Sequence, residues 1–170
     1  MKNNLDLEVL YYNARGLANK QRLIEFELVL QKVRWDIVGL SEVRRKGNEL
    51  ICRKNGNYFY FHGETKGYKG VRFYIKESVW KRVKEIKKVN ERICALKLEI
   101  GRKILMTIIQ IYAPILDAED KEIREFYMKL QETVEKEGEY YTVVMGGLEW
   151  DSGKMRGNSE RGKIWVRSTK

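Results

Sequence analysis

The stretch LDLEVLYYNARGLANKQRLIEFELVLQKVRWDIVGLSE, residues 5–42, decides the fold because its apolar pattern changes period twice. Apolar and other side chains alternate over residues 5–12, which predicts a strand. Residues 36–40 form a short, almost continuous apolar run, which is typical of a strand buried on both faces. Between them the pattern predicts an amphipathic helix over residues 19–34, with Asn19 as its N-cap and a buried face made of Leu23, Phe26, Leu30 and Val33.

A strand, a helix and a second strand in this order predict a parallel pair joined by a right-handed crossover. Open sheets of this kind bind ligands at the carboxyl ends of their strands. Asn13 and Glu42 stand at these two ends. The sequence therefore predicts a functional site at this edge of the sheet, with both polar side chains in it.

The middle of the chain alternates strand-like segments with glycine-containing and charged turns. Gly101 and Arg102 are a tight hairpin signal between two of these segments. We expect an antiparallel meander whose strands cover residues 58–61, 70–76, 79–89, 93–100 and 104–112.

A second amphipathic helix is expected after Pro114, with Asp117 as its candidate cap and Ile123, Phe126, Leu130 and Val134 on its buried face. A buried strand follows over residues 140–145 and ends at Gly146-Gly147. Residues 154–170 contain six Lys or Arg and one Glu. We expect them to form a poorly ordered basic tail, so that the folded domain covers residues 1–153. No repeat or linker indicates a second domain.

The charge of the chain favours an anionic partner. Lys and Arg number 34 against 24 Asp and Glu, which gives a net charge of +10. Such a surface attracts nucleic acid, although a basic protein without such a partner is an equal alternative on charge alone. No apolar run approaches the roughly 18 residues of a membrane helix, so we expect no membrane contact. The oligomeric state is not indicated.

The cysteines and the single histidine limit the kinds of catalytic site and metal site that the chain could contain. Cys52 and Cys94 lack metal-type spacing, which favours reduced thiols in the core and an intracellular location, nuclear or cytoplasmic. A Ser-His-Asp enzyme or a histidine zinc site would have to use His62. Because His62 follows an aromatic strand, it is more typical of a surface or strand-end residue.

Short motifs follow the predicted strands in a fixed order. The main ones are YNARGL at residues 12–17, LSEVR at residues 40–44 and IYAP at residues 111–114. KGVRF at residues 69–73 and the apolar strand leading to Gly146 complete the set. This ordered set resembles the endonuclease/exonuclease/phosphatase family. It is most similar to the nuclease domains of RTE- or BovB-type non-LTR retrotransposons, and to captured cellular copies of the craniofacial development protein 2 type.

The resemblance implies an α/β protein, a four-layer α/β sandwich of the DNase I type that is incomplete at its C-terminus. It also implies hydrolysis of DNA phosphodiesters with Mg²⁺ or Mn²⁺, hard cations that prefer oxygen ligands and stabilise charge on the leaving oxygen. In that reaction Glu42 would be the metal ligand, Asn13 would lie near the metal or the scissile phosphate, and Tyr112 would lie over the phosphate. Surface cations beside the strand ends are candidates for contacts with DNA phosphates, namely Arg15, Arg44 and Arg45.

The sequence departs from the family pattern in two places. Where the family has Gly-Asp-x-Asn, the chain reads Gly146-Gly147-Leu148-Glu149, so Gly147 supplies no carboxylate. The family's Ser-Asp-His motif would come later than Lys170. We therefore expect impaired catalysis, with Glu149 as a weak candidate for a catalytic carboxylate.

Three functions remain open at this point. The first is a degenerate endonuclease-like domain with little catalysis that keeps DNA affinity through its charge. The second is a working Mg²⁺-dependent nuclease that recruits Glu149 or Asp151. The third is a non-catalytic basic scaffold or protein-interaction module. Salt-sensitive DNA binding would favour the first two, and metal-dependent cleavage would separate the second from the first.

Overall fold

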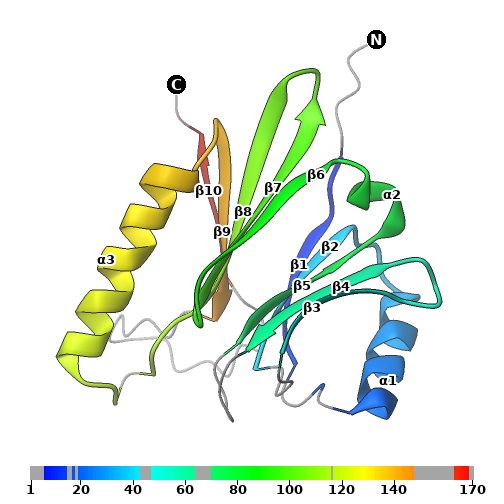
Figure 1. Ribbon diagram of the computed structural model, residues 1–170, viewed down its shortest axis with the longest axis horizontal. Coiled ribbons are helices and arrows are strands. Elements are labelled where there is room, and N and C mark those ends of the chain that lie inside the picture. Colours follow the sequence, from blue (N-terminus) through cyan, green and yellow to red (C-terminus); the bar gives the residue numbers. More distant parts are fainter. Residues whose placement is uncertain are drawn as a thin grey trace.

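Two sheets packed face to face, with one helix on each outer side, form the body of the molecule (Figure 1). The computed structural model describes residues 6–14, 17, 19–42, 47–63, 70–115, 117–147 and 163–168. Its layers follow in the order α1, first sheet, second sheet and α3. This confirms the four-layer α/β sandwich.

The first sheet contains the predicted crossover. Helix α1 (Lys20–Leu30) connects β1 to β2, and these two strands are parallel, with Asn13 opposite Ser41. The remaining neighbours in this sheet are antiparallel. In spatial order its strands are β1 (Val9–Asn13), β2 (Ile37–Ser41), β5 (Val71–Ile75), β4 (Tyr58–Gly63) and β3 (Gly47–Cys52).

The second sheet contains another parallel pair. Helix α3 (Asp120–Glu137) connects β8 to β9, and Tyr112 lies opposite Gly147 in their register. The hairpin predicted at Gly101-Arg102 joins β7 to β8. In spatial order the strands are β10 (Lys163–Ser168), β9 (Tyr141–Gly147), β8 (Ile104–Tyr112), β7 (Ile93–Gly101) and β6 (Val83–Asn90).

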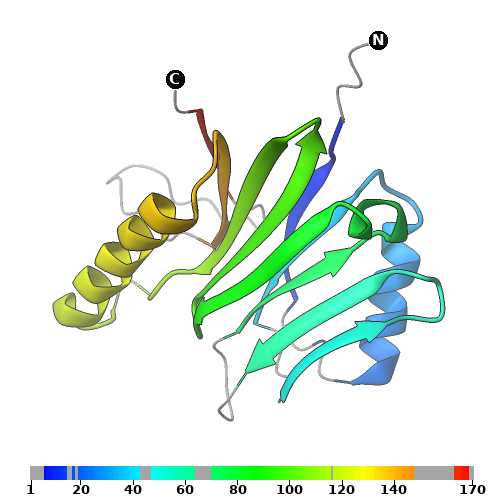
Figure 2. The same cartoon turned by 45° about the horizontal axis from the view of Figure 1, so that its top comes forward.

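The inner faces of the two sheets form the central core. Ile37 and Phe73 of the first sheet pack with Leu96, Ile108 and Met145 of the second, and all five are fully buried. Burial of each such side chain contributes about 1.5–3 kcal/mol. The turned view in Figure 2 shows the sheets facing each other, with α1 beyond one and α3 beyond the other.

Helix α1 forms where predicted but ends earlier. The side chain of Asn19 accepts a hydrogen bond from the backbone N–H of Arg22 at 2.8 Å, which confirms the cap. Leu23 and Phe26 are buried against the first sheet, as is Leu30. The expectation of a buried Val33 was wrong, because the helix ends at Leu30 and Val33 is 49% exposed.

Helix α3 has the predicted buried face but another cap. Phe126 is buried, and Leu130 and Val134 pack beside it against the second sheet. Its N-cap residue is Glu119, which makes no side-chain cap hydrogen bond. The prediction of Asp117 as the cap was wrong, because Asp117 lies in the turn before the helix.

Two predicted features of the strands differ from the structure, and one strand was not predicted. The segment that was expected to start a strand at residue 79 begins as the short helix α2 (Glu77–Trp80), and β6 follows. Because α2 lies between β5 and β6, the expected single meander is divided between the two sheets. Strand β3 was not predicted, since its sequence GNELIC lacks a regular alternation.

The remaining corrections concern the tail and two side chains. Residues 163–168 were expected in an irregular tail, but they form β10, which pairs antiparallel with β9. Their Ile-Trp-Val run favours a strand, and the edge of β9 offers unpaired backbone groups. Cys52 was expected in the core and is exposed, whereas Cys94 is buried. His62 lies at the end of β4, as one alternative had it, and is buried.

Candidate functional site

The ends of four strands meet at one edge of the sandwich. Parallel pairing brings the carboxyl ends of β1 and β2 together, and likewise those of β8 and β9. Across the core, β2 contacts β8 and β9, and β1 contacts β9. Asn13 and Glu42 of the first sheet thereby face Tyr112 and Gly147 of the second.

The carboxylate of Glu42 is the centre of this edge. Its Oε1 accepts a hydrogen bond from Asn13 Nδ2 at 3.0 Å and a longer one from the Tyr112 hydroxyl at 3.4 Å. All three side chains are partly buried. The structure therefore brings together the three residues that the resemblance singled out, although they are up to 99 positions apart in the sequence (112 − 13).

The backbone of Glu42 is strained. Its φ is +57°, in the left-handed region that residues other than glycine, asparagine and aspartate seldom adopt. Such a conformation costs on the order of 1–3 kcal/mol and persists only where the surroundings impose it. Strain of this kind gathers at functional sites, which makes Glu42 a stronger candidate than its position after a strand alone would.

Tyr112 is held as a neutral hydrogen-bond donor. Burial raises its pKa above the ordinary value, the charge of Glu42 raises it further, and the charge of Arg92 opposes these effects. Arg92 Nη1 donates to the Tyr112 carbonyl at 3.2 Å, and its guanidinium lies 5.5 Å from the centre of the Tyr112 ring. Arg92 also pairs with Glu122 of α3. Arg92 thus contacts both the backbone and the ring of Tyr112.

Sequence reasoning missed Tyr11 and Ser41. The hydroxyl of Tyr11 lies 2.6 Å from Ser41 Oγ, and Ser41 is fully buried. Burial raises the pKa of Tyr11, and the charge of Glu42 adds to this. The signal was available, because residues two apart in a strand share a face and Tyr11 precedes Asn13 by two. Tyr11 was instead counted among the alternating apolar side chains of the strand, so it was not singled out as a site residue.

The donor set fits a hard divalent cation that keeps much of its water. Glu42 offers one carboxylate, and Mg²⁺ is commonly held by one or two carboxylates together with water and phosphate oxygens. Among the described residues no group of three or more His, Cys, Asp or Glu could enclose a metal ion. The carboxylate of Glu42 therefore suits a metal shared with a phosphate ligand.

Several predicted site residues lie outside the described part of the chain. These are the phosphate-contact candidates Arg15, Arg44 and Arg45 and the carboxylates Glu149 and Asp151. Their roles stay predictions, as do the chemical roles of Asn13, Glu42 and Tyr112.

Sequence comparison finds a distant curated relative. The chain is 28% identical over 125 residues to craniofacial development protein 2 from Bos taurus, which covers 73% of this chain and 21% of that protein. The same protein from Tragulus javanicus matches with the same identity and coverage. The chain thus spans about a fifth of the length of these relatives. No protein-family profile matches the chain.

Solved structures share the architecture. The 3′ phosphatase NExo from Neisseria, bound to a product DNA hairpin, has a TM-score of 0.62 at 19% identity, over 83% of this chain and 57% of that one. D. rerio TDP2 complexed with a single-strand DNA product has a TM-score of 0.54 at 14% identity, over 82% and 59%. An endonuclease/exonuclease/phosphatase family protein from Leptotrichia buccalis has a TM-score of 0.53 at 11% identity, over 83% and 66%.

These comparisons establish the fold. The chain has the endonuclease/exonuclease/phosphatase, or DNase I-like, fold and spans about three-fifths of the solved chains that share it. Within the described residues, no helix is both long enough and apolar enough to cross a membrane.

Proposed function

We propose that this chain is a retrotransposon-derived endonuclease-like domain. It binds a divalent cation and a DNA phosphate at the Glu42 carboxylate, and it hydrolyses the phosphodiester slowly. The observation that carries the proposal is the convergence of Asn13, Tyr112 and Glu42 from three strand ends, with Glu42 held in a strained backbone conformation.

Each of the three side chains has a distinct part in the proposed reaction. Mg²⁺ or Mn²⁺ would be held by Glu42 and would supply stabilisation of negative charge on the phosphate and the leaving oxygen. Asn13 orients the carboxylate through its Nδ2 donor. Tyr112 keeps its proton, since its pKa is raised, and can donate it in a hydrogen bond to a phosphate oxygen beside Glu42.

The reduced rate follows from the residue at position 147. A water molecule that attacks a phosphodiester has to be oriented and deprotonated by a base, most often a carboxylate or an imidazole. Glycine stands at position 147, where the resemblance leads us to expect an aspartate. General-base assistance is worth on the order of 10²–10⁴-fold in rate, so a loss in that range is expected.

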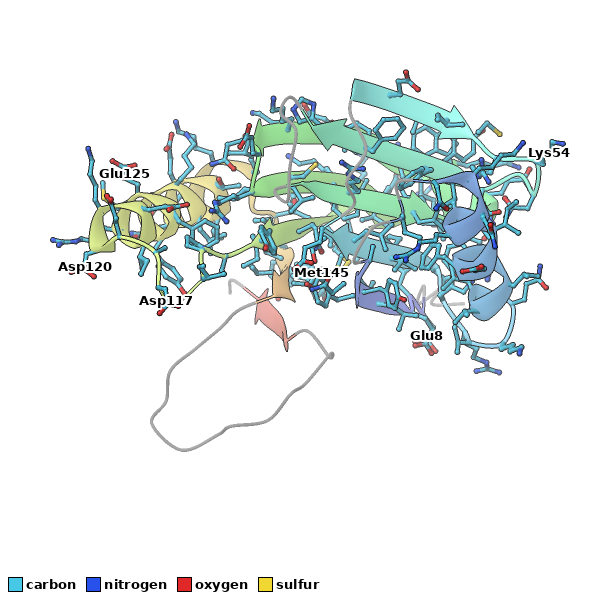
Figure 3. The ribbon with its side chains drawn as sticks, turned by 90° about the horizontal axis from the view of Figure 1, so that it is seen from below. Glu8, Lys54, Asp117, Asp120, Glu125 and Met145 are labelled. Atoms are coloured by element: carbon cyan, nitrogen blue, oxygen red, sulfur yellow. The ribbon has the colours of Figure 1, made fainter. Side chains whose placement is uncertain are left out.

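DNA is the proposed substrate because of charge and structural kinship. The net charge of +10 favours a polyanion, and two structurally similar proteins were solved with DNA products. Charge is not uniform over the surface. Asp117, Asp120 and Glu125 gather at the outer end formed by α3 (Figure 3). We therefore expect DNA at the strand-end edge and not at that end. A nuclear or cytoplasmic location belongs to this proposal.

Nicking of supercoiled plasmid tests the proposal. Purified protein with Mg²⁺ or Mn²⁺ should convert supercoiled to open-circular DNA slowly, and Glu42→Gln should abolish the conversion. Arg102→Ala, in the hairpin at the far end of β8, is the matched control and should nick at the natural rate. Nicking that persists in Glu42→Gln would contradict the assignment of Glu42.

The second candidate function is a non-catalytic DNA-binding or protein-interaction scaffold. The absence of a carboxylate at Gly147 favours it. A folded protein that retards DNA in a gel shift without nicking would support DNA binding alone. A folded protein that does neither would leave only protein interaction.

A further inference from the structure

Position 147 is kept free of a side chain by Tyr11. A Cβ atom built on Gly147 would lie 2.9 Å from the Tyr11 hydroxyl oxygen, closer than real Cβ contacts come, but 3.8 Å from the ring carbon that carries that oxygen. The latter distance is an ordinary van der Waals contact. A single oxygen atom, at the end of the Tyr11 side chain, would therefore have to shift before position 147 could carry a side chain.

The neighbouring glycine is fixed in a different way. Gly146 has a φ of +153°, and a Cβ there would lie 2.0 Å from the backbone carbonyl oxygen of Ile111. No change of another side chain could relieve that contact. Gly146 is thus constrained by the backbone, whereas Gly147 is constrained by the side chain of Tyr11.

The Tyr11 hydroxyl contacts Ser41 of the first sheet and lies beside position 147 of the second. It lies 2.6 Å from Ser41 Oγ of β2, and the charge of Glu42 contributes to its raised pKa. Tyr112 lies opposite Gly147 in the register of β8 and β9. Either hydroxyl can donate in the Tyr11–Ser41 hydrogen bond, and when Ser41 donates, the phenol proton is available to a ligand at the Glu42 carboxylate.

We propose that Tyr11 and Gly147 are a matched pair, in which the Tyr11 hydroxyl occupies the place of a side chain at position 147 and acts as a positioning group of the phosphodiester site. The role of Tyr11 toward phosphate rests on the proposed function. The steric pairing of Tyr11 with Gly147 does not depend on that function. While Tyr11 is present, a carboxylate at position 147 has to displace the Tyr11 hydroxyl.

A double-mutant cycle in urea unfolding tests the pairing without any activity. Gly147→Ala alone should lower the unfolding midpoint or prevent folding. In the background of Tyr11→Phe, which removes only the hydroxyl, the same substitution should leave the midpoint of Tyr11→Phe unchanged. An equal loss in both backgrounds, or no loss in either, would overturn the pairing.

The site role is tested by Mn²⁺ binding, followed by electron paramagnetic resonance. Gly147→Asp combined with Tyr11→Phe should bind Mn²⁺ at least tenfold more tightly than Gly147→Asp alone, because only the double variant can turn the new carboxylate toward Glu42. The double variant should also nick plasmid faster than the natural chain. Equal Mn²⁺ affinities would overturn the site role. Tighter Mn²⁺ binding without nicking would leave the pair standing and contradict the nuclease function instead.

Discussion

Glu42 combines a costly backbone conformation with a carboxylate that accepts hydrogen bonds from Asn13 and Tyr112. Its φ of +57° is poorly suited to a long unbranched side chain, whereas asparagine tolerates this region well. If stability alone governed this position, asparagine or glycine would serve better. The presence of glutamate is therefore an argument for function at the residue scale.

Two substitutions at Glu42 separate strain from charge. Glu42→Gln keeps the strain and removes the carboxylate, while Glu42→Asn removes both. We expect the Asn variant to be more stable than the Gln variant by about 1 kcal/mol, since left-handed strain is of that order. Both should lose Mn²⁺ binding. Urea unfolding of the two variants side by side measures the difference, and equal stabilities would show that φ at position 42 is not strained.

The candidate site could be predicted from the sequence only in part. Asn13 and Glu42 were accessible, because parallel strands end at one edge and both residues stand at such ends. Tyr112 entered through the resemblance and not through spacing. No sequence pattern indicated that Arg92 belongs to the site, because its contact with Tyr112 depends on how β7 pairs with β8. A register that joins distant segments is set by packing, which local patterns do not encode.

At the scale of elements, the two long helices begin differently. Asn19 caps α1 through its side chain, whereas Asp117 makes no cap for α3. Asn19→Ala should therefore lower the free energy of unfolding by about 1 kcal/mol, and Asp117→Ala should change it by less than about 0.5 kcal/mol. Urea unfolding measures both. Equal effects of the two substitutions would contradict the assignment of the caps.

The elements that the sequence predicted are those with a strong local period. Residues 19–34 and the helix after Pro114 carry the 3.6-residue period, and β2 is a short apolar run between turns. Strand β3 was missed because pairing with β4 forms it, in spite of a weak pattern. Strand β10 was missed for a similar reason, since β9 provides its partner. The division of strands between two sheets is a tertiary property and had no local signal.

Tyr74 links α1 to the first sheet and makes the stability of the fold decrease at alkaline pH. Its hydroxyl donates to Glu27 Oε1 at 2.8 Å and accepts from Asn55 at 3.0 Å, and burial raises its pKa to about 12. Tyrosine in an unfolded chain ionises near pH 10, so neutral Tyr74 stabilises the fold fully below about pH 10. This contribution is lost as the pH rises from about 10 to about 12.

Unfolding in urea at pH 9, 10 and 11 checks this limit. Stability should fall with rising pH, by at most about 1.4 kcal/mol per pH unit for each such group. Tyr74→Phe should have a shallower fall, although not a flat one, because burial also raises the pKa of Tyr60 to about 12. An unchanged slope in Tyr74→Phe would show that Tyr74 does not limit alkaline stability.

At the scale of the whole molecule, the position of charge decides how DNA would bind. Asp117, Asp120 and Glu125 disfavour DNA at the start of α3, which lies to one side of Met145 of β9 in Figure 3. The cations nearest in sequence to the site residues are Arg15, Arg44 and Arg45. An equal number of exposed cations lies before β6 and in the β7–β8 hairpin, at the other end of β8 from Tyr112, namely Lys81, Arg102 and Lys103.

Removal of either set of three cations lowers the net charge equally, from +10 to +7. If DNA lies over the strand-end edge, alanine at Arg15, Arg44 and Arg45 should weaken binding to duplex DNA. It should also reduce the slope of log K against log salt by about 0.9 for each DNA phosphate that the variant no longer neutralises. Alanine at Lys81, Arg102 and Lys103 should leave the slope unchanged. Fluorescence anisotropy of a labelled duplex across a salt series measures both. Equal weakening in the two variants would mean that the protein attracts DNA through net charge alone, and the phosphodiester site would then have no orienting surface.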